Sequence, residues 1–215
     1  MDFLWGDEMT EGDQWIADDP GVIPTHLRTI TMAVYDTPTT FQLDGRLTDI
    51  RPWADGTTAE RNLHDMHLRL EVRRADLIIT RAEARMGAFP HAECPGIAPA
   101  FAGLVGLSVS RGFTKEVQAR FGRSKGCSHL EFLARALAPA VIQAIPSTAL
   151  RREPPETAGN DVLKGTNWLA DTCHVWAEDG PGSQKIALGW RPGGNYPAPP
   201  LEEIRRSLRS ENSAS

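Results

Sequence analysis

Apolar and polar side chains alternate along much of residues 27–86, as in β-strands that bury one face. The clearest case is 66–72, where His67, Arg69 and Glu71 separate the apolar positions. Segments rich in threonine, valine, isoleucine and tyrosine predict three further strands, over 29–35, 40–50 and 77–86. The connections between the segments are short, which favours an antiparallel meander.

Helical spacing replaces this alternation after residue 95. The strongest pattern covers 128–145, where one stripe carries Leu130, Leu133, Ala134, Leu137, Val141 and Ala144. Shorter helices are predicted over 95–107 and 114–121. A sheet with one apolar face needs a covering layer. We therefore expect an α+β domain, in which a meander of about four antiparallel strands is covered by the C-terminal helices.

Composition divides the chain into four predicted parts. Residues 1–26 form an acidic mobile arm, because the first twenty contain seven acidic residues and no lysine or arginine. The main domain is expected over 27–145. Proline and glycine over 146–165 indicate a linker or long loop. Residues 166–215 are expected to form an extension that packs on the main domain and ends in a disordered tail.

Charge and cysteine content limit the partners. A net charge of -5 over 215 residues argues against binding to nucleic acid. The acidic start is unlike a secretory signal, and we find no apolar run long enough to cross a bilayer. Three cysteines form no disulfide framework, which favours a cytoplasmic location. The sequence is compatible with a homodimer.

Candidate chemistry is concentrated around Cys127 and His129, at the start of the strongest helix. Ser128 and Glu131 have the spacing of a capping box, which predicts Ser128 as the N-cap. Cys127 would then lie at the helix end, where the macrodipole favours a thiolate that binds a metal or attacks an electrophile. The alternative is a small buried residue that only packs under the helix.

A second group of candidates lies at the expected sheet edge. His64 and Asp65 open the third predicted strand, and Cys94 directly precedes a predicted helix. Imidazole and thiolate are the usual zinc ligands, so one zinc or iron ion is predicted on His64, Cys94, Cys127 and His129. Proton transfer is assigned to His64, Asp65 and His129. Asp49 lies on the first hairpin, without a partner that the sequence identifies. Cys173 and His174 are interpreted as packing residues.

The chain resembles a bacterial family known as domain of unknown function 2889. The resemblance covers roughly 27–145 and rests on four segments, Gly45 to Asp49, Leu63 to Met66, Cys94 with Pro95, and Gly126 to Leu130. The chain is also similar in plan, more distantly, to iron-sulfur cluster assembly scaffolds. That resemblance places Cys94 and Cys127 on two of the scaffold cysteines and Asn62 on the third, which weakens a cluster and favours a single ion.

Resemblance to the first family implies an enzyme that acts on a small lignin-derived aromatic compound. The implied reaction is carbon-carbon cleavage of the retro-aldol type with release of formaldehyde, with or without a metal ion. The scaffold resemblance implies the alternative, a metal or iron-sulfur carrier. No nucleotide cofactor is expected from the sequence, because its glycine groups lack the setting of a phosphate loop. A third alternative is a protein in which the motif residues merely pack.

Overall fold

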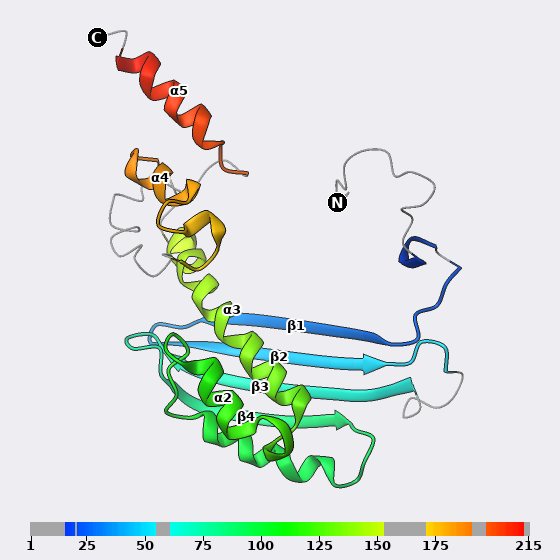
Figure 1. The fold of residues 1–215 in the computed structure, drawn as a ribbon. Coiled ribbons are helices and arrows are strands. Elements are labelled where there is room, and N and C mark those ends of the chain that lie inside the picture. Colours follow the sequence, from blue (N-terminus) through cyan, green and yellow to red (C-terminus); the bar gives the residue numbers. More distant parts are fainter. Residues whose placement is uncertain (1–15, 20, 55–60, 153–170, 191–196, 213–215) are drawn as a thin grey trace. The chain divides into compact units, whose positions relative to one another are not determined.

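The computed structural model describes residues 16–19, 21–54, 61–152, 171–190 and 197–212. The chain divides into two compact units, Met1–Gln143 and Ala144–Ser215. Figure 1 shows the ribbon. The first fifteen residues of the predicted acidic arm lie outside the described residues. The described part of the arm contains the short 3-10 helix η1 (Ile16–Asp18).

One antiparallel sheet of four strands forms the centre of the first unit, in the order β1-β2-β3-β4. The strands are β1 (Leu27–Asp36), β2 (Thr40–Ile50), β3 (Asn62–Arg73) and β4 (Ile79–Ala88). Each strand pairs antiparallel with the next one in the sequence. The predicted meander is therefore confirmed, and β1 and β3 extend beyond their predicted ends.

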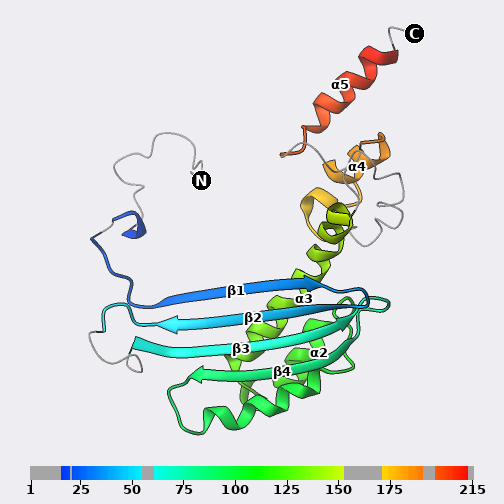
Figure 2. The ribbon, with the colours of Figure 1, turned by 180° about the vertical axis from the view of Figure 1, so that it is seen from behind.

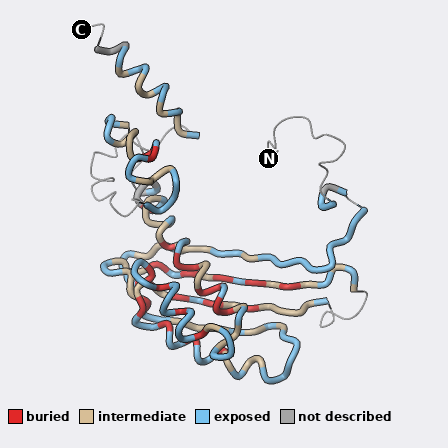
Figure 3. Tube along the Cα trace, in the orientation of Figure 1, coloured by how far each residue is buried: buried red, intermediate tan, exposed pale blue. Residues whose placement is uncertain are grey.

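Three helical segments cover one face of this sheet (Figure 1). These are η2 (Cys94–Leu104), which is a 3-10 helix, α2 (Phe113–Phe121) and the start of α3 (Ser128–Arg152). Helix η2 packs against β4, and Leu133 and Leu137 of α3 lie against Gly45 of β2. The largest fully buried side chains include Phe41, Leu47, Met66, Leu68, Phe101, Leu104, Leu130, Leu133 and Leu137. Figure 3 shows this buried layer between sheet and helices, as expected of an α+β domain.

The other face of the sheet is polar and is seen in front in Figure 2. Ion pairs join neighbouring strands there, including Arg46 with Asp65 and Arg69 with Asp44. Within the described part of the first unit, no helix covers this face. The alternation of each strand therefore decides whether a side chain faces the helices or the solvent.

Helix α3 is longer than predicted. It continues through Pro146 to Arg152, so the expected helix end at 145 is wrong, and the first residues of the expected linker 146–165 are helical. Residues 153–165 lie outside the described part. No helix of the described residues is long and apolar enough to span a membrane.

The described residues of the second unit form three short elements besides the end of α3. They are the 3-10 turn η5 (His174–Trp176), α4 (Pro181–Ala187) and α5 (Leu201–Asn212). Cys173 is exposed and precedes η5. Helix α5 was not predicted from the sequence. Its apolar positions Leu201, Ile204 and Leu208 have helical spacing, and a helix is consistent with that pattern.

Candidate functional site

The site begins as a row of three residues across the sheet. Arg28 on β1 and His64 on β3 are both register partners of Asp49 on β2. Asp49 has the same parity along β2 as the buried Leu43 and Leu47, so its carboxylate faces the helix layer. The row therefore sets a carboxylate between a guanidinium and an imidazole on the inner face, near one end of the strands.

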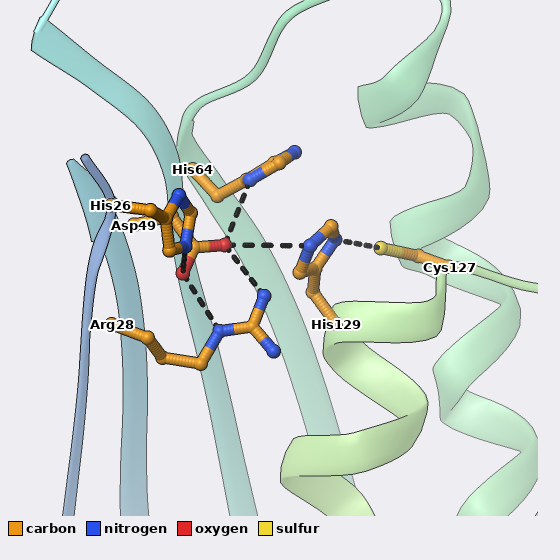
Figure 4. A network of polar contacts seen from close by, with 6 residues as sticks. All are labelled: His26, Arg28, Asp49, His64, Cys127 and His129. Carbon is orange, nitrogen blue, oxygen red and sulfur yellow. Dashed lines mark hydrogen bonds and ion pairs between the residues drawn. The ribbon is translucent and has the colours of Figure 1, made fainter. Parts of the chain in front are cut away.

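The Asp49 carboxylate is the centre of a polar network (Figure 4). Its side chain is 0% exposed. Arg28 donates from Nε to Oδ1 at 2.7 Å and from Nη2 to Oδ2 at 2.8 Å. His26 Nε2 lies 3.1 Å from Oδ1, and His64 Nδ1 lies 2.9 Å from Oδ2. Both oxygens thus have several partners, as a buried carboxylate requires.

This network decides the charge of Asp49. Burial by itself raises the pKa of the carboxyl group, but the hydrogen bonds and the positive charge of Arg28 outweigh it, with help from His26 and His64. The pKa of Asp49 falls from 3.8 to about 2. The same contact raises the pKa of Arg28. Asp49 is therefore an anion at neutral pH, held beside a permanent cation.

Helix α3 brings a second imidazole to the same carboxylate. His129 Nε2 lies 3.4 Å from Asp49 Oδ2, and its ring centroid lies 3.8 Å from that of His64. Burial lowers the pKa of His129, and repulsion by the positive form of His64 lowers it further, against the opposing pull of Asp49. The site therefore favours a neutral imidazole at this position.

The start of α3 differs by one residue from the prediction. The N-H of Glu131 donates to the carbonyl of Cys127 at 2.9 Å, so Cys127 occupies the N-cap and Ser128 is the first helical residue. The Glu131 carboxylate instead pairs with Arg135. The expected capping box on Ser128 is therefore wrong, while Cys127 remains at the helix end.

Three of these residues have the geometry of a metal site. Asp49, His64 and His129 each offer one ligand atom, and these atoms lie within 4.8 Å of one another. Two imidazoles and one carboxylate are a common ligand set for iron and zinc. The carboxylate in this set is Asp49, which the sequence had left without a partner.

The predicted ligands Cys94 and Cys127 lie near this cluster but are not part of it. Cys127 Sγ lies 3.8 Å from Nδ1 of His129, on the ring nitrogen opposite to the one that faces Asp49. Cys127 is thus placed to orient the His129 ring rather than to share an ion with it. Cys94 lines a pocket together with His64, His129 and Cys127. The structure therefore brings His64 and His129 together, with the two cysteines beside them.

Asp65 lies on the other face of the sheet from its neighbour His64. Arg46 donates to both of its carboxylate oxygens, at 2.7 and 2.9 Å, and His67 lies 3.2 Å away. These contacts lower the pKa of Asp65, chiefly through Arg46. The structure does not bring Asp65 to His64, because consecutive residues of a strand point to opposite faces. Asp49 takes the position that was expected for Asp65.

An open pocket of about 380 Å³ lies in front of the two imidazoles. His64 and His129 line it together with Cys94 and Cys127, while Asp49 and Arg28 do not. The rest of the lining includes the apolar side chains of Met66, Met86 and Ile97 and the polar side chains of His91, Glu93 and Ser128. A volume of this order suits a small organic molecule. The imidazoles therefore stand between the pocket and the buried carboxylate.

Sequence reasoning missed Arg28 and His26, and it left Asp49 without a role. A signal for Asp49 was present, because a carboxylate at a position with the parity of Leu43 and Leu47 must be buried and needs partners. No comparable signal marked Arg28 or His26, since their role depends on the register between β1 and β2.

Comparisons with known proteins identify the family alone. No curated protein matches the chain, and no solved structure matches it. One family model, described as protein of unknown function (DUF2889), matches residues 26–143. The match includes the whole four-stranded sheet and every residue of the Asp49 network. Since it covers more than half of the chain, the protein belongs to the DUF2889 family of proteins of unknown function.

Proposed function

We propose that the pocket in front of His64 and His129 is the active site of a small-molecule enzyme. The reaction we assign is carbon-carbon cleavage of the retro-aldol type, with release of formaldehyde from a lignin-derived aromatic compound. The observation that carries the proposal is the position of His64, which lines the pocket and contacts a buried carboxylate at 2.9 Å. An imidazole oriented in this way by a carboxylate is a common general base.

The proposed step uses the two nitrogens of His64 differently. When Nδ1 carries the ring proton, it donates to Asp49, and Nε2 is left with the lone pair. Nε2 then takes the hydroxyl proton of a hydroxymethyl side chain. The carbon-carbon bond breaks, formaldehyde leaves, and the electron pair remains on the ring-side carbon. Protonated His64 returns the proton to that carbon, so the step is balanced without a further reactant.

His129 is proposed as the second proton-transfer group. Its lowered pKa keeps it neutral near pH 7, and a neutral imidazole both accepts and donates hydrogen bonds. Cys127 on one side of the ring and Asp49 on the other hold it in place. The apolar part of the pocket, which includes Met66 and Met86, suits an aromatic ring.

A second candidate is a metal site for one zinc or iron ion, which the Asp49, His64 and His129 geometry favours. The ion would either assist the cleavage by holding the developing oxyanion or be the cargo of a carrier protein. His64 distinguishes the two candidates. Metal binding requires that Nδ1 of His64, the nitrogen that faces Asp49, carries no proton. Action of His64 as a general base requires the proton on that same nitrogen.

Formaldehyde release from an aromatic dimer with a hydroxymethyl side chain tests the enzyme proposal. We expect His64→Ala and His129→Ala each to lower the rate by at least about a hundredfold. His67→Ala is the matched control, because His67 lies on the same strand but faces the polar side with Asp65. Full activity in both active-site variants, or no formaldehyde from the wild-type protein, would contradict the proposal.

Elemental analysis of the purified protein separates the two candidates. A stoichiometric zinc or iron content that is lost in His129→Ala, together with no turnover of the dimer, would favour the carrier. Turnover that survives exhaustive treatment with a chelator would favour the metal-free base.

A further inference from the structure

The Arg28 guanidinium binds the Asp49 carboxylate, which a metal ion at this site would also have to bind. Its Nη2 donates to Oδ2 of Asp49 at 2.8 Å. The same oxygen lies 2.9 Å from Nδ1 of His64 and 3.4 Å from Nε2 of His129. An ion that coordinates Oδ2 therefore has to share this oxygen with the Arg28 bond. The permanent charge of Arg28 also repels a divalent cation at that short range.

We propose that Arg28 is an internal cation that takes the place of a metal ion at Asp49 and sets the metal affinity of the site. The proposal rests on the Asp49, His64 and His129 ligand geometry of the second candidate function. It goes beyond that function because it names the residue that decides whether an ion binds. In the wild-type protein, Arg28 keeps the affinity for a divalent cation low.

The position of Arg28 allows this exchange. Its side chain is 38% exposed and comes from β1, an edge strand of the sheet, whereas the Asp49 side chain is fully buried. Arg28 can therefore swing towards solvent while the carboxylate and the two imidazoles stay in place. Its Nε bond to Oδ1 uses the other carboxylate oxygen, so displacement from Oδ2 alone already frees a coordination position.

The other face of the sheet provides a matched control. Arg46 donates to both oxygens of Asp65 at 2.7 and 2.9 Å, almost the same geometry as Arg28 on Asp49. That pair lies at the polar surface, and the ligand group formed by Asp49, His64 and His129 does not include it. Replacement of Arg46 should thus disturb an arginine-carboxylate pair without changing the proposed site.

Zinc titration of the full chain by calorimetry tests the proposal. We expect Arg28→Gln to bind one zinc ion at least about tenfold more tightly than the wild-type protein, because the competing cation is gone. Arg28→Lys should lie between the two, since lysine keeps the charge but not the paired hydrogen bonds. Arg46→Gln should have the wild-type affinity. Zinc affinity in Arg28→Gln that is no higher than in the wild-type protein would overturn the proposal.

Thermal unfolding with and without zinc gives a second readout. Loss of Arg28 removes the permanent cation beside the buried Asp49 carboxylate, so Arg28→Gln should unfold at a lower temperature than the wild type without zinc. Added zinc should raise that temperature more in Arg28→Gln than in the wild type. An equal or smaller shift in Arg28→Gln would count against the proposal.

The double variant Arg28→Gln with His129→Ala distinguishes failure of the metal site from failure of the role proposed for Arg28. If zinc binding in Arg28→Gln survives the loss of His129, the ion lies elsewhere, and the metal site and this proposal both fail. If the wild-type protein binds zinc through His129 but Arg28→Gln binds it no better, only the role of Arg28 fails.

Discussion

His64 and Asp49 are cross-strand partners whose side chains meet, with Nδ1 of the imidazole 2.9 Å from Oδ2 of the carboxylate. The carboxylate is fully buried, whereas the imidazole lines the pocket. This arrangement fixes the ring and directs its second nitrogen away from Asp49. The contact therefore joins a buried carboxylate of the sheet to a side chain that lines the pocket.

Asp49→Asn should destabilise the protein by about 3 kcal/mol, because it leaves the Arg28 charge without its partner in a half-buried site. Urea unfolding measures this change. The control is Asp65→Asn, which breaks the similar but more exposed pair with Arg46 and should cost about 1 kcal/mol or less. Equal effects of the two substitutions would mean that the Asp49 network has no special energetic role.

The Asp49 pair should also give the stability a specific acid dependence. The folded pKa of about 2 lies below the ordinary 3.8, so this contribution is complete above pH 3.8 and is lost as the pH falls towards 2. The shift corresponds to about 2 kcal/mol. The difference in unfolding free energy between the wild type and Asp49→Asn should shrink by about that amount over this interval. A constant difference would contradict the lowered pKa.

His129 should titrate below the ordinary value of 6.5 for histidine. The unfolded chain then binds the proton more readily than the folded one, so this contribution to stability is complete above 6.5 and is lost as the pH falls through the lowered pKa. Ring signals in NMR spectra measure the pKa directly. His64→Ala should move it upward by removing the repulsion, whereas His67→Ala should leave it unchanged.

Helix α3 packs closely on β2 at Gly45. A methyl group on Gly45 would lie 3.0 Å from Leu137 and 3.2 Å from Leu133, which is too close for an unstrained contact. Gly45→Ala should therefore destabilise the first unit by about 1 to 2 kcal/mol, and Gly45→Val by more. Gly96→Ala is the control, because nothing lies within 4 Å of the added methyl group. Similar thermal unfolding of Gly45→Val and the wild type would show that the layers are not in close contact there.

The sequence by itself determined the architecture of the first unit. Alternation along 66–72 and the helical stripe after 128 are local patterns, and burial of their apolar faces requires a sheet covered by helices. The end of α3 was misplaced, because Pro146 was taken as a helix end although the helix passes through it to Arg152. The sequence also identified His64, His129 and Cys127 as candidates, from their residue types and their positions at element ends.

Only the tertiary structure decided which groups meet. Register between β1, β2 and β3 places Arg28 and His64 beside Asp49, and no local pattern encodes a pairing between strands. Parity within β3 separates Asp65 from His64, although the two are adjacent in the chain. Packing of α3 on the sheet then adds His129 to the same carboxylate. The site is thus formed by contacts between distant segments, whereas the fold follows from patterns within each segment.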